Sequence, residues 1–219
     1  MQDFGLYFEM GWQHILDWNG YDHILFVVAL CALFLLQDWK KILVLVTAFT
    51  IGHSITLALS VLHYLHINRN LIEFLIPVTI VVTAFANIIR LPATKERGKA
   101  VFSYSTGRLK IQPAALKGRV QLNYYFALFF GLLHGLGFST YLKSMLGAQT
   151  NIVLPLLSFN LGLEVGQLVI VGGVLLCSTL VTGVFQVSRR DWSFFLSSAI
   201  FGIALLMMIT RAHTLLTGH

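Results

Sequence analysis

The chain has 219 residues, of which 57% are hydrophobic and 11% are charged, with a mean hydropathy of +0.78 and a formal net charge of +6. So few charged side chains cannot cover the surface of a soluble globule of this length, which excludes that class of protein. The composition predicts an all-α, polytopic membrane helix bundle that forms one integral membrane domain over residues 1–219. The positive charge is explained by membrane topology, and nucleic acid is not an expected partner.

Six apolar segments are long enough to cross a bilayer, which takes about 17–25 residues. They lie at 22–36, 42–62, 71–91, 123–146, 152–184 and 193–211. The first is short unless its helix begins earlier, within Phe8–Trp18. Because Asn19-Gly20 is a turn dipeptide, a broken or re-entrant element is expected here, and such breaks frequently line transport sites.

Lysine and arginine residues predict the orientation, because cytoplasmic loops carry an excess of them. In the six-span arrangement only Arg69, Lys143 and Arg211 fall near the other side. The cytoplasmic side then carries Lys40, Lys41, Arg90, Lys95, Arg97, Lys99, Arg108, Lys110, Lys117, Arg119, Arg189 and Arg190. This predicts a multi-pass protein of the inner (plasma) membrane with both termini outside and a basic cytoplasmic loop at 92–122.

Several predicted spans contain polar side chains that a lipid-embedded helix normally lacks. An ionisable group at the bilayer centre costs about 2.5–3.5 kcal/mol on insertion scales, so one shared polar site is the most economical explanation. The candidate metal ligands are His14, Asp22, His23, His53, His134 and Glu164, with Thr50, Asn160 and Gln167 as supporting polar residues.

The Asp22-His23 pair and the polar residues of the fifth span are the most informative of these. Adjacent residues point about 100° apart on a helix, so one of the pair is expected to ligate and the other to orient a neighbour. A helix cap explains Asp22 equally well. Asn160, Glu164 and Gln167 are spaced i, i+4 and i+7, so they share one helical face and indicate a built site.

The helix rise of about 1.5 Å per residue predicts how deep each ligand lies. Asp22 and His23 are expected near the outer surface, His53 more than about 10 Å down, and His134 and Glu164 near the midplane. We therefore expect a graded series of ligands, with His53, His134 and Glu164 around one cavity open to the outer face. Imidazole and carboxylate suit divalent Ni, Co, Zn, Mn or Fe better than Cu(I), and ligand type alone does not choose among these metals.

Other features limit the possible functions. Cys31 and Cys177 sit singly in predicted spans, so neither a disulfide nor a thiolate metal site is expected. Glu73, at the start of the third span, is expected to be an interfacial carboxylate. No Gly-x-x-x-x-Gly-Lys-Ser/Thr motif is present, so the chain itself is not expected to use ATP. Gly52-His53 and His134-Gly135 echo each other loosely, without a convincing internal repeat.

At these residues the chain resembles the HupE/UreJ family of small membrane proteins, over most of its length. The resemblance rests on the His14…Asp22-His23-Ile-Leu-Phe opening, Phe49-Thr-Ile-Gly-His53-Ser, Phe130-Gly-Leu-Leu-His134-Gly and Phe159-Asn-Leu-Gly-Leu-Glu164, whose order together is fairly specific. The spacing between His14 and Asp22 is longer than is usual in the family. The pattern over Phe49–Thr56 and the polar residues of Asn160–Gln167 resemble a divergent branch of the family. The resemblance implies nickel uptake that serves hydrogenase and urease.

The leading hypothesis is a permease for a divalent metal ion, most readily nickel or cobalt, in which the candidate ligands bind the ion in turn. The alternative is an intramembrane zinc-dependent hydrolase, in which Glu164 or Asp22 would activate water; no His-Glu-x-x-His motif supports it. A third hypothesis is a structural or assembly membrane protein in which the histidines only connect helices to each other. Membrane lipids and a metal ion (Ni, Co or Zn) are the expected partners, and a homo-oligomer is possible.

Overall fold

The computed structural model describes residues 2–18, 20–62, 64–65, 68–90, 117–146 and 152–217. This part of the chain is all helical, which confirms the predicted fold class. The elements are α1 (Gln2–Leu16), α2 (Asp22–Cys31), a short 3-10 helix (Leu36–Asp38), α3 (Trp39–Val61), α4 (Arg69–Arg90), α5 (Lys117–Leu146), α6 (Val153–Gly183) and α7 (Arg189–Thr217). The loop expected over 92–122 lies outside the described residues up to position 116, and α5 already begins at Lys117.

Four described segments are long and apolar enough to cross a membrane, whereas the sequence predicted six spans. They are Leu36–Val61, Arg69–Ile89, Val153–Gly183 and Arg189–Thr217. The other two apolar helical segments, Asp22–Cys31 and Tyr124–Ser139, are shorter. The expected first span is short because the chain divides it between two helices.

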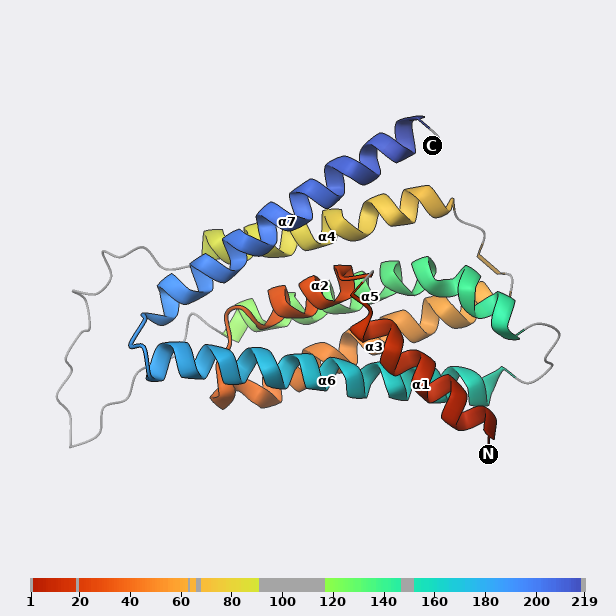
Figure 1. Cartoon of the computed structure of the whole chain (residues 1–219), viewed down its shortest axis with the longest axis horizontal. Helices are drawn as coiled ribbons and strands as arrows, with labels where there is room; N and C mark the ends of the chain where they lie inside the picture. Colours follow the sequence, from red (N-terminus) through yellow and green to blue (C-terminus); the bar gives the residue numbers. More distant parts are fainter. Residues whose placement is uncertain are drawn as a thin grey trace.

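That division is the broken element expected around Asn19-Gly20. Helix α1 ends at Leu16 and α2 begins at Asp22. Figure 1 shows α1 running from the N-terminal end of the bundle to its middle, where α2 takes over and continues toward the opposite end. The break therefore places two helix ends inside the bundle.

Helix α1 packs tightly along α6 through glycines. A Cβ atom on Gly11 would collide with the backbone carbonyl of Phe159, and one on Gly162 would collide with the carbonyl of Phe8. One α-helical turn further along, Gly166 lies against the side chain of Ile15. Residue numbers rise together along both helices, so α1 and α6 are parallel neighbours whose backbones touch.

Helices α3 and α5 form a second contact of the same kind. A Cβ on Gly52 would collide with the carbonyl of Leu128, and one on Gly131 with the carbonyl of Phe49. Gly135 in turn lies against the backbone of α3 and the hydroxyl of Thr56. Here too the residue numbers rise together, so α3 and α5 are parallel.

The two parallel pairs are related to each other. Each of the four helices contributes one glycine and, three residues before it, one carbonyl group that the glycine of the partner helix contacts. In α1, for example, these are Gly11 and the carbonyl of Phe8. Figure 1 shows that α1 and α6 run away from the end that holds the N-terminus, whereas α3 and α5 run toward it. The bundle is therefore built on two glycine-packed pairs of opposite direction, an arrangement that resembles the inverted repeats of transporters.

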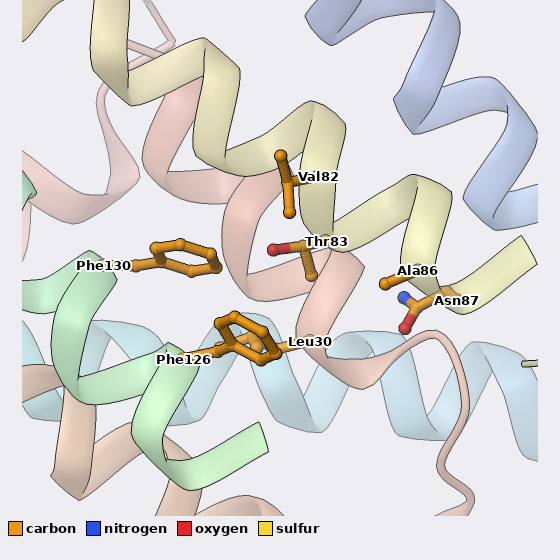
Figure 2. A pocket seen from close by; sticks show the side chains of 7 residues that line it. All are labelled: Leu30, Val82, Thr83, Ala86, Asn87, Phe126 and Phe130. Carbon is orange, nitrogen blue, oxygen red and sulfur yellow. The ribbon is translucent and has the colours of Figure 1, made fainter. Parts of the chain in front are cut away.

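A small pocket lies between α2, α4 and α5. Its volume is about 20 Å³, and its lining includes Leu30, Thr83, Asn87, Phe126 and Phe130 (Figure 2). Asn87 is buried and its amide nitrogen donates a 2.7 Å hydrogen bond to the carbonyl of Ala29, which ties α4 to the last turns of α2.

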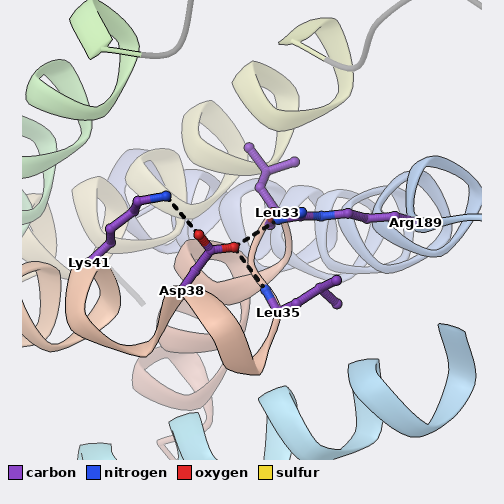
Figure 3. Close-up of polar contacts among 5 residues, drawn as sticks. All are labelled: Leu33, Leu35, Asp38, Lys41 and Arg189. Carbon is purple, nitrogen blue, oxygen red and sulfur yellow. Dashed lines mark hydrogen bonds and ion pairs between the residues drawn. The ribbon is translucent and has the colours of Figure 1, made fainter. Parts of the chain in front are cut away.

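Charged residues hold the ends of α7. Asp38 accepts hydrogen bonds from Lys41 at 2.7 Å and Arg189 at 3.0 Å, while Arg189 also donates to the carbonyl of Leu33 at 2.7 Å (Figure 3). At the other end Glu73 pairs with Arg69 at 2.7 Å and with Arg211 at 2.6 Å. Glu73 is therefore an ion-paired carboxylate in the second turn of α4, and exposed pairs of this kind contribute about 0–1 kcal/mol each.

Alanine at Gly131 or Gly162 is expected to destabilise the bundle by about 1–3 kcal/mol, because the new methyl group meets a backbone carbonyl that cannot move aside. Gly172→Ala is the control, since Gly172 lies in α6 with nothing within 4 Å of the added Cβ. Thermal unfolding in detergent measures the effect. Equal melting temperatures for Gly162→Ala and Gly172→Ala would contradict the close helix contact.

Candidate metal centre

The histidines gather at the break between α1 and α2. His14 lies in the last turn of α1 and His23 in the first turn of α2. His53 reaches the same place from α3, and His134 from α5. Both glycine-packed pairs therefore contribute to the cluster, because α1 belongs to one pair while α3 and α5 form the other.

The rings are close enough for a shared ligand. One nitrogen from each of His14, His23 and His53 lies within 4.8 Å of the others. The ring centroids of His14 and His23 are 4.5 Å apart, and those of His14 and His53 are 6.2 Å apart. His134 joins from the other side, with its centroid 4.9 Å from that of His23. We call these four residues the histidine cluster.

The Nε2 nitrogens of the cluster have no hydrogen-bond partner in the described part of the chain. The Nε2 atoms of His14, His23, His53 and His134 are all buried and accept or donate no hydrogen bond among the described residues. Leaving one buried polar atom unpaired costs about 1–3 kcal/mol. Four such atoms in one place require a physical explanation, such as a bound ion or ordered water.

Two members of the cluster are held in the form that binds metal. Nδ1 of His23 lies 2.9 Å from a carboxylate oxygen of Asp22, which also accepts the backbone N–H of His23 at 2.8 Å. Nδ1 of His134 lies 2.9 Å from the carbonyl of Phe130. Both oxygens only accept, so each Nδ1 carries the proton and each Nε2 presents a lone pair. Asp22 is thus the residue that orients and His23 the one that points into the cluster, as at many metal sites.

Asn160 lies beside His53 without a hydrogen bond of normal geometry between them. Its amide nitrogen donates instead to the carbonyl of Leu156 at 2.8 Å, and its oxygen has no partner. Neither ring nitrogen of His53 is hydrogen-bonded. His53 is therefore the member of the cluster with both ring nitrogens buried and without a partner among the described residues.

Aromatic rings enclose the cluster, and the sequence analysis did not assign them this role. The ring centroid of Phe138 is 3.9 Å from that of His14, and Phe159 stacks against His53 at 6.1 Å. Phe26 and Phe49 each lie 5.3 Å from His134. The available signal was that phenylalanines flank each of the histidine-bearing motifs.

Glu164 is not part of this cluster. Its carboxylate accepts a 2.8 Å hydrogen bond from Thr47, and Gln167 accepts one of 2.9 Å from Thr50. These two bonds join α3 to α6, so the helical face of α6 that carries Glu164 and Gln167 is turned toward α3. Thr47 was missed by the sequence analysis, although it lies one turn before Thr50 on the same face.

The expected series of ligands at different depths is wrong, because His23 touches His134 directly. The depth estimate assumed that α2 starts at the membrane surface. The break instead lets α2 start within the bundle. The pocket of Figure 2 lies elsewhere, between α2, α4 and α5, so the expected cavity shared by His53, His134 and Glu164 stays a prediction.

The geometry suits a divalent ion after a small rearrangement. Nitrogens that bind one tetrahedral ion at about 2.0–2.1 Å lie about 3.3 Å from each other. The nitrogens of His14, His23 and His53 lie within 4.8 Å of one another, so each pair would have to shorten its separation from at most this value to about 3.3 Å. Among the described residues no hydrogen bond holds the Nε2 atom of His53 or that of His14, so none has to break when the nitrogens approach.

Comparison with known protein families gives one match for this chain. The family model described as HupE / UreJ protein matches residues 1–214, which is nearly the whole chain. The chain belongs to the HupE/UreJ family. Neither a curated protein nor a solved structure matches it. HupE/UreJ membership links the chain to the handling of nickel and cobalt at a membrane, and the histidine cluster gives that role a physical location to test.

Asp22→Asn is expected to weaken the binding of a divalent metal by about 10–100-fold, because the neutral amide no longer holds His23 in its Nδ1-protonated form. Isothermal titration with nickel(II) measures the effect. Asp191→Asn is the control, since Asp191 lies on the surface and bonds only locally to Ser188. Equal affinities for the two variants would show that Asp22 does not orient a ligand.

Proposed function

We propose that this HupE/UreJ protein is a permease for a divalent metal ion, nickel or cobalt, with His14, His23, His53 and His134 as its binding site. The observation that carries the proposal is the meeting of four buried Nε2 atoms without partners at a break between two helices. Neutral imidazole is a good ligand for these ions. The metal is the cargo, so the site must both bind and release it.

Charge balance supports a dication in particular. Neutral histidines bring no charge, so a bound ion needs anionic groups nearby in a medium of low dielectric constant. Asp38 and Glu73 are paired with basic side chains, and Glu9, Asp17 and Asp191 are exposed. Of the carboxylates whose surroundings the structure describes, this leaves Asp22 beside the cluster and Glu164 on α6, and two carboxylates would balance the charge of one divalent ion.

The arrangement of the helices supports transport. In many transporters the substrate site lies where inverted repeats meet, and discontinuous helices form it. Here α1/α6 and α3/α5 run in opposite directions (Figure 1). The histidine cluster includes residues from the end of α1 and the start of α2, at the break between these helices. Motion of one pair against the other would expose the cluster first to one end of the bundle and then to the other.

The hydrolase alternative gains no support from these contacts. Hydrolysis at a bound zinc ion needs an acid or base beside it that is free to take a proton. Among the described carboxylates Asp22 is occupied with His23, and Glu164 is hydrogen-bonded to Thr47.

We propose an inner-membrane topology with both termini outside. The start of α1 and the end of α7 lie at the same end of the bundle, whereas α7 begins, with Arg189, at the opposite end, where α3 also begins, near Lys40 and Lys41 (Figure 1). That second end is the cytoplasmic one by the positive-inside rule.

His134→Ala and Glu164→Gln are each expected to reduce nickel or cobalt uptake by proteoliposomes at least about tenfold, because they remove a ligand and a counter-charge respectively. His213→Ala is the control, since His213 is exposed near the end of α7. A wild-type rate in Glu164→Gln would contradict the charge balance. Wild-type protein that takes up no metal but cleaves a lipid or peptide in a chelator-sensitive way would replace the permease with the hydrolase.

A cysteine introduced at Gly107, in a background without Cys31 and Cys177, tests the topology. A membrane-impermeant thiol reagent should label it only after intact cells are permeabilised. Labelling in intact cells would reverse the proposed orientation.

A further inference from the structure

The pocket of Figure 2 shares two helices, α2 and α5, with the histidine cluster and lies further toward one end of the bundle, where α4 completes its lining. Along α2, Leu30 in the pocket is seven residues beyond His23, which is about 10 Å by helix rise. Along α5, Phe126 is eight residues before His134, or about 12 Å. Asn87 lies three residues before α4 ends at Arg90. The pocket is therefore on the side of the cluster that we propose to be cytoplasmic.

Phenylalanine rings separate the pocket from the cluster. Phe130 lines the pocket, and its carbonyl accepts the Nδ1 proton of His134. Phe26 touches both sides, with its ring 5.3 Å from Phe130 and 5.3 Å from His134. Phe26 is fully buried and Phe130 is 4% exposed. An ion leaving the cluster toward this end would meet these two rings first, and apolar constrictions of this kind gate other channels.

Beyond the rings the pocket offers oxygen atoms. Figure 2 shows the Thr83 hydroxyl and the Asn87 carboxamide on α4, across from the rings of Phe126 and Phe130 on α5. A volume of about 20 Å³ is enough for one water molecule. Neutral oxygen ligands bind nickel and cobalt more weakly than imidazole does, so a site of this kind would receive an ion without retaining it.

We propose that this pocket is the inner exit station of the transport path, with Thr83 and Asn87 as its ligands and the Phe26–Phe130 pair as the gate. The proposal rests on the proposed function. The ion leaves the histidine cluster when the ring of Phe130 turns aside, passes into the pocket, and continues toward the cytoplasm. Thr83 and Asn87 therefore affect the rate of transport and not the affinity of the cluster.

Thr83→Val is the primary test, because it keeps the shape of the side chain and removes only the hydroxyl. Its control is Thr179→Val, since the Thr179 hydroxyl, like that of Thr83, bonds to the carbonyl four residues earlier at 2.8 Å. We expect Thr83→Val to bind nickel(II) like the wild type in isothermal titration and to take it up about tenfold more slowly in proteoliposomes. Asn87→Leu should show the same separation if it folds without the bond to Ala29.

Phe130→Ala tests the gate, with Phe129→Ala as its control, because Phe129 is 53% exposed on the same helix. Phe130→Ala should release nickel(II) from preloaded protein at least about tenfold faster than Phe129→Ala does.

The outcomes separate the two proposals. A wild-type protein that neither binds nor transports nickel(II) overturns the proposed function. The exit station alone is overturned if all variants bind nickel(II) normally, Thr83→Val takes it up at the wild-type rate, and Phe130→Ala releases it no faster than Phe129→Ala. The proposed permease function is then unaffected.

Discussion

The structure depends on the cost of burying imidazole nitrogens without partners. The Nε2 atoms of His14, His23, His53 and His134 all point into the core, and nothing in the described part of the chain satisfies them. Such an arrangement is retained in a folded protein when the unpaired groups serve a ligand. The rest of the bundle can be understood as the framework that brings these four side chains to one place and keeps two of them in the correct tautomer.

Two contacts between helix backbones provide that framework. Gly11 and Gly162 bring α1 against α6, and Gly52 and Gly131 bring α3 against α5. His14 and His134 each follow one of these glycines by three residues, so close packing and ligand placement are set by the same turns of helix. Because the two pairs run in opposite directions, the cluster lies between two units that can move against each other, as alternating access requires.

The sequence predicted the kinds of residue in the site better than their arrangement. The all-helical class, the break near Gly20 and the candidate histidines followed from hydropathy, turn chemistry and the cost of polar groups in lipid. The sequence did not predict that the four histidines meet at one level of the bundle, because this depends on α2 starting inside the bundle. The position of Glu164 against Thr47 did not follow either, since helical periodicity shows that residues share a face but not which helix that face meets. The two glycine-packed helix pairs of opposite direction were not predicted from the sequence, because their four helices share only the three-residue spacing between a contacting carbonyl and a glycine.

Anomalous X-ray scattering from crystals grown with nickel(II) or cobalt(II) tests the central claim most directly. We expect one principal anomalous peak between His14, His23 and His53, within reach of His134, at about 2.0–2.2 Å from the coordinating nitrogens. A principal peak at an exposed residue such as His213, with the histidine cluster empty, would contradict the account and leave the four imidazoles as a structural feature of the bundle.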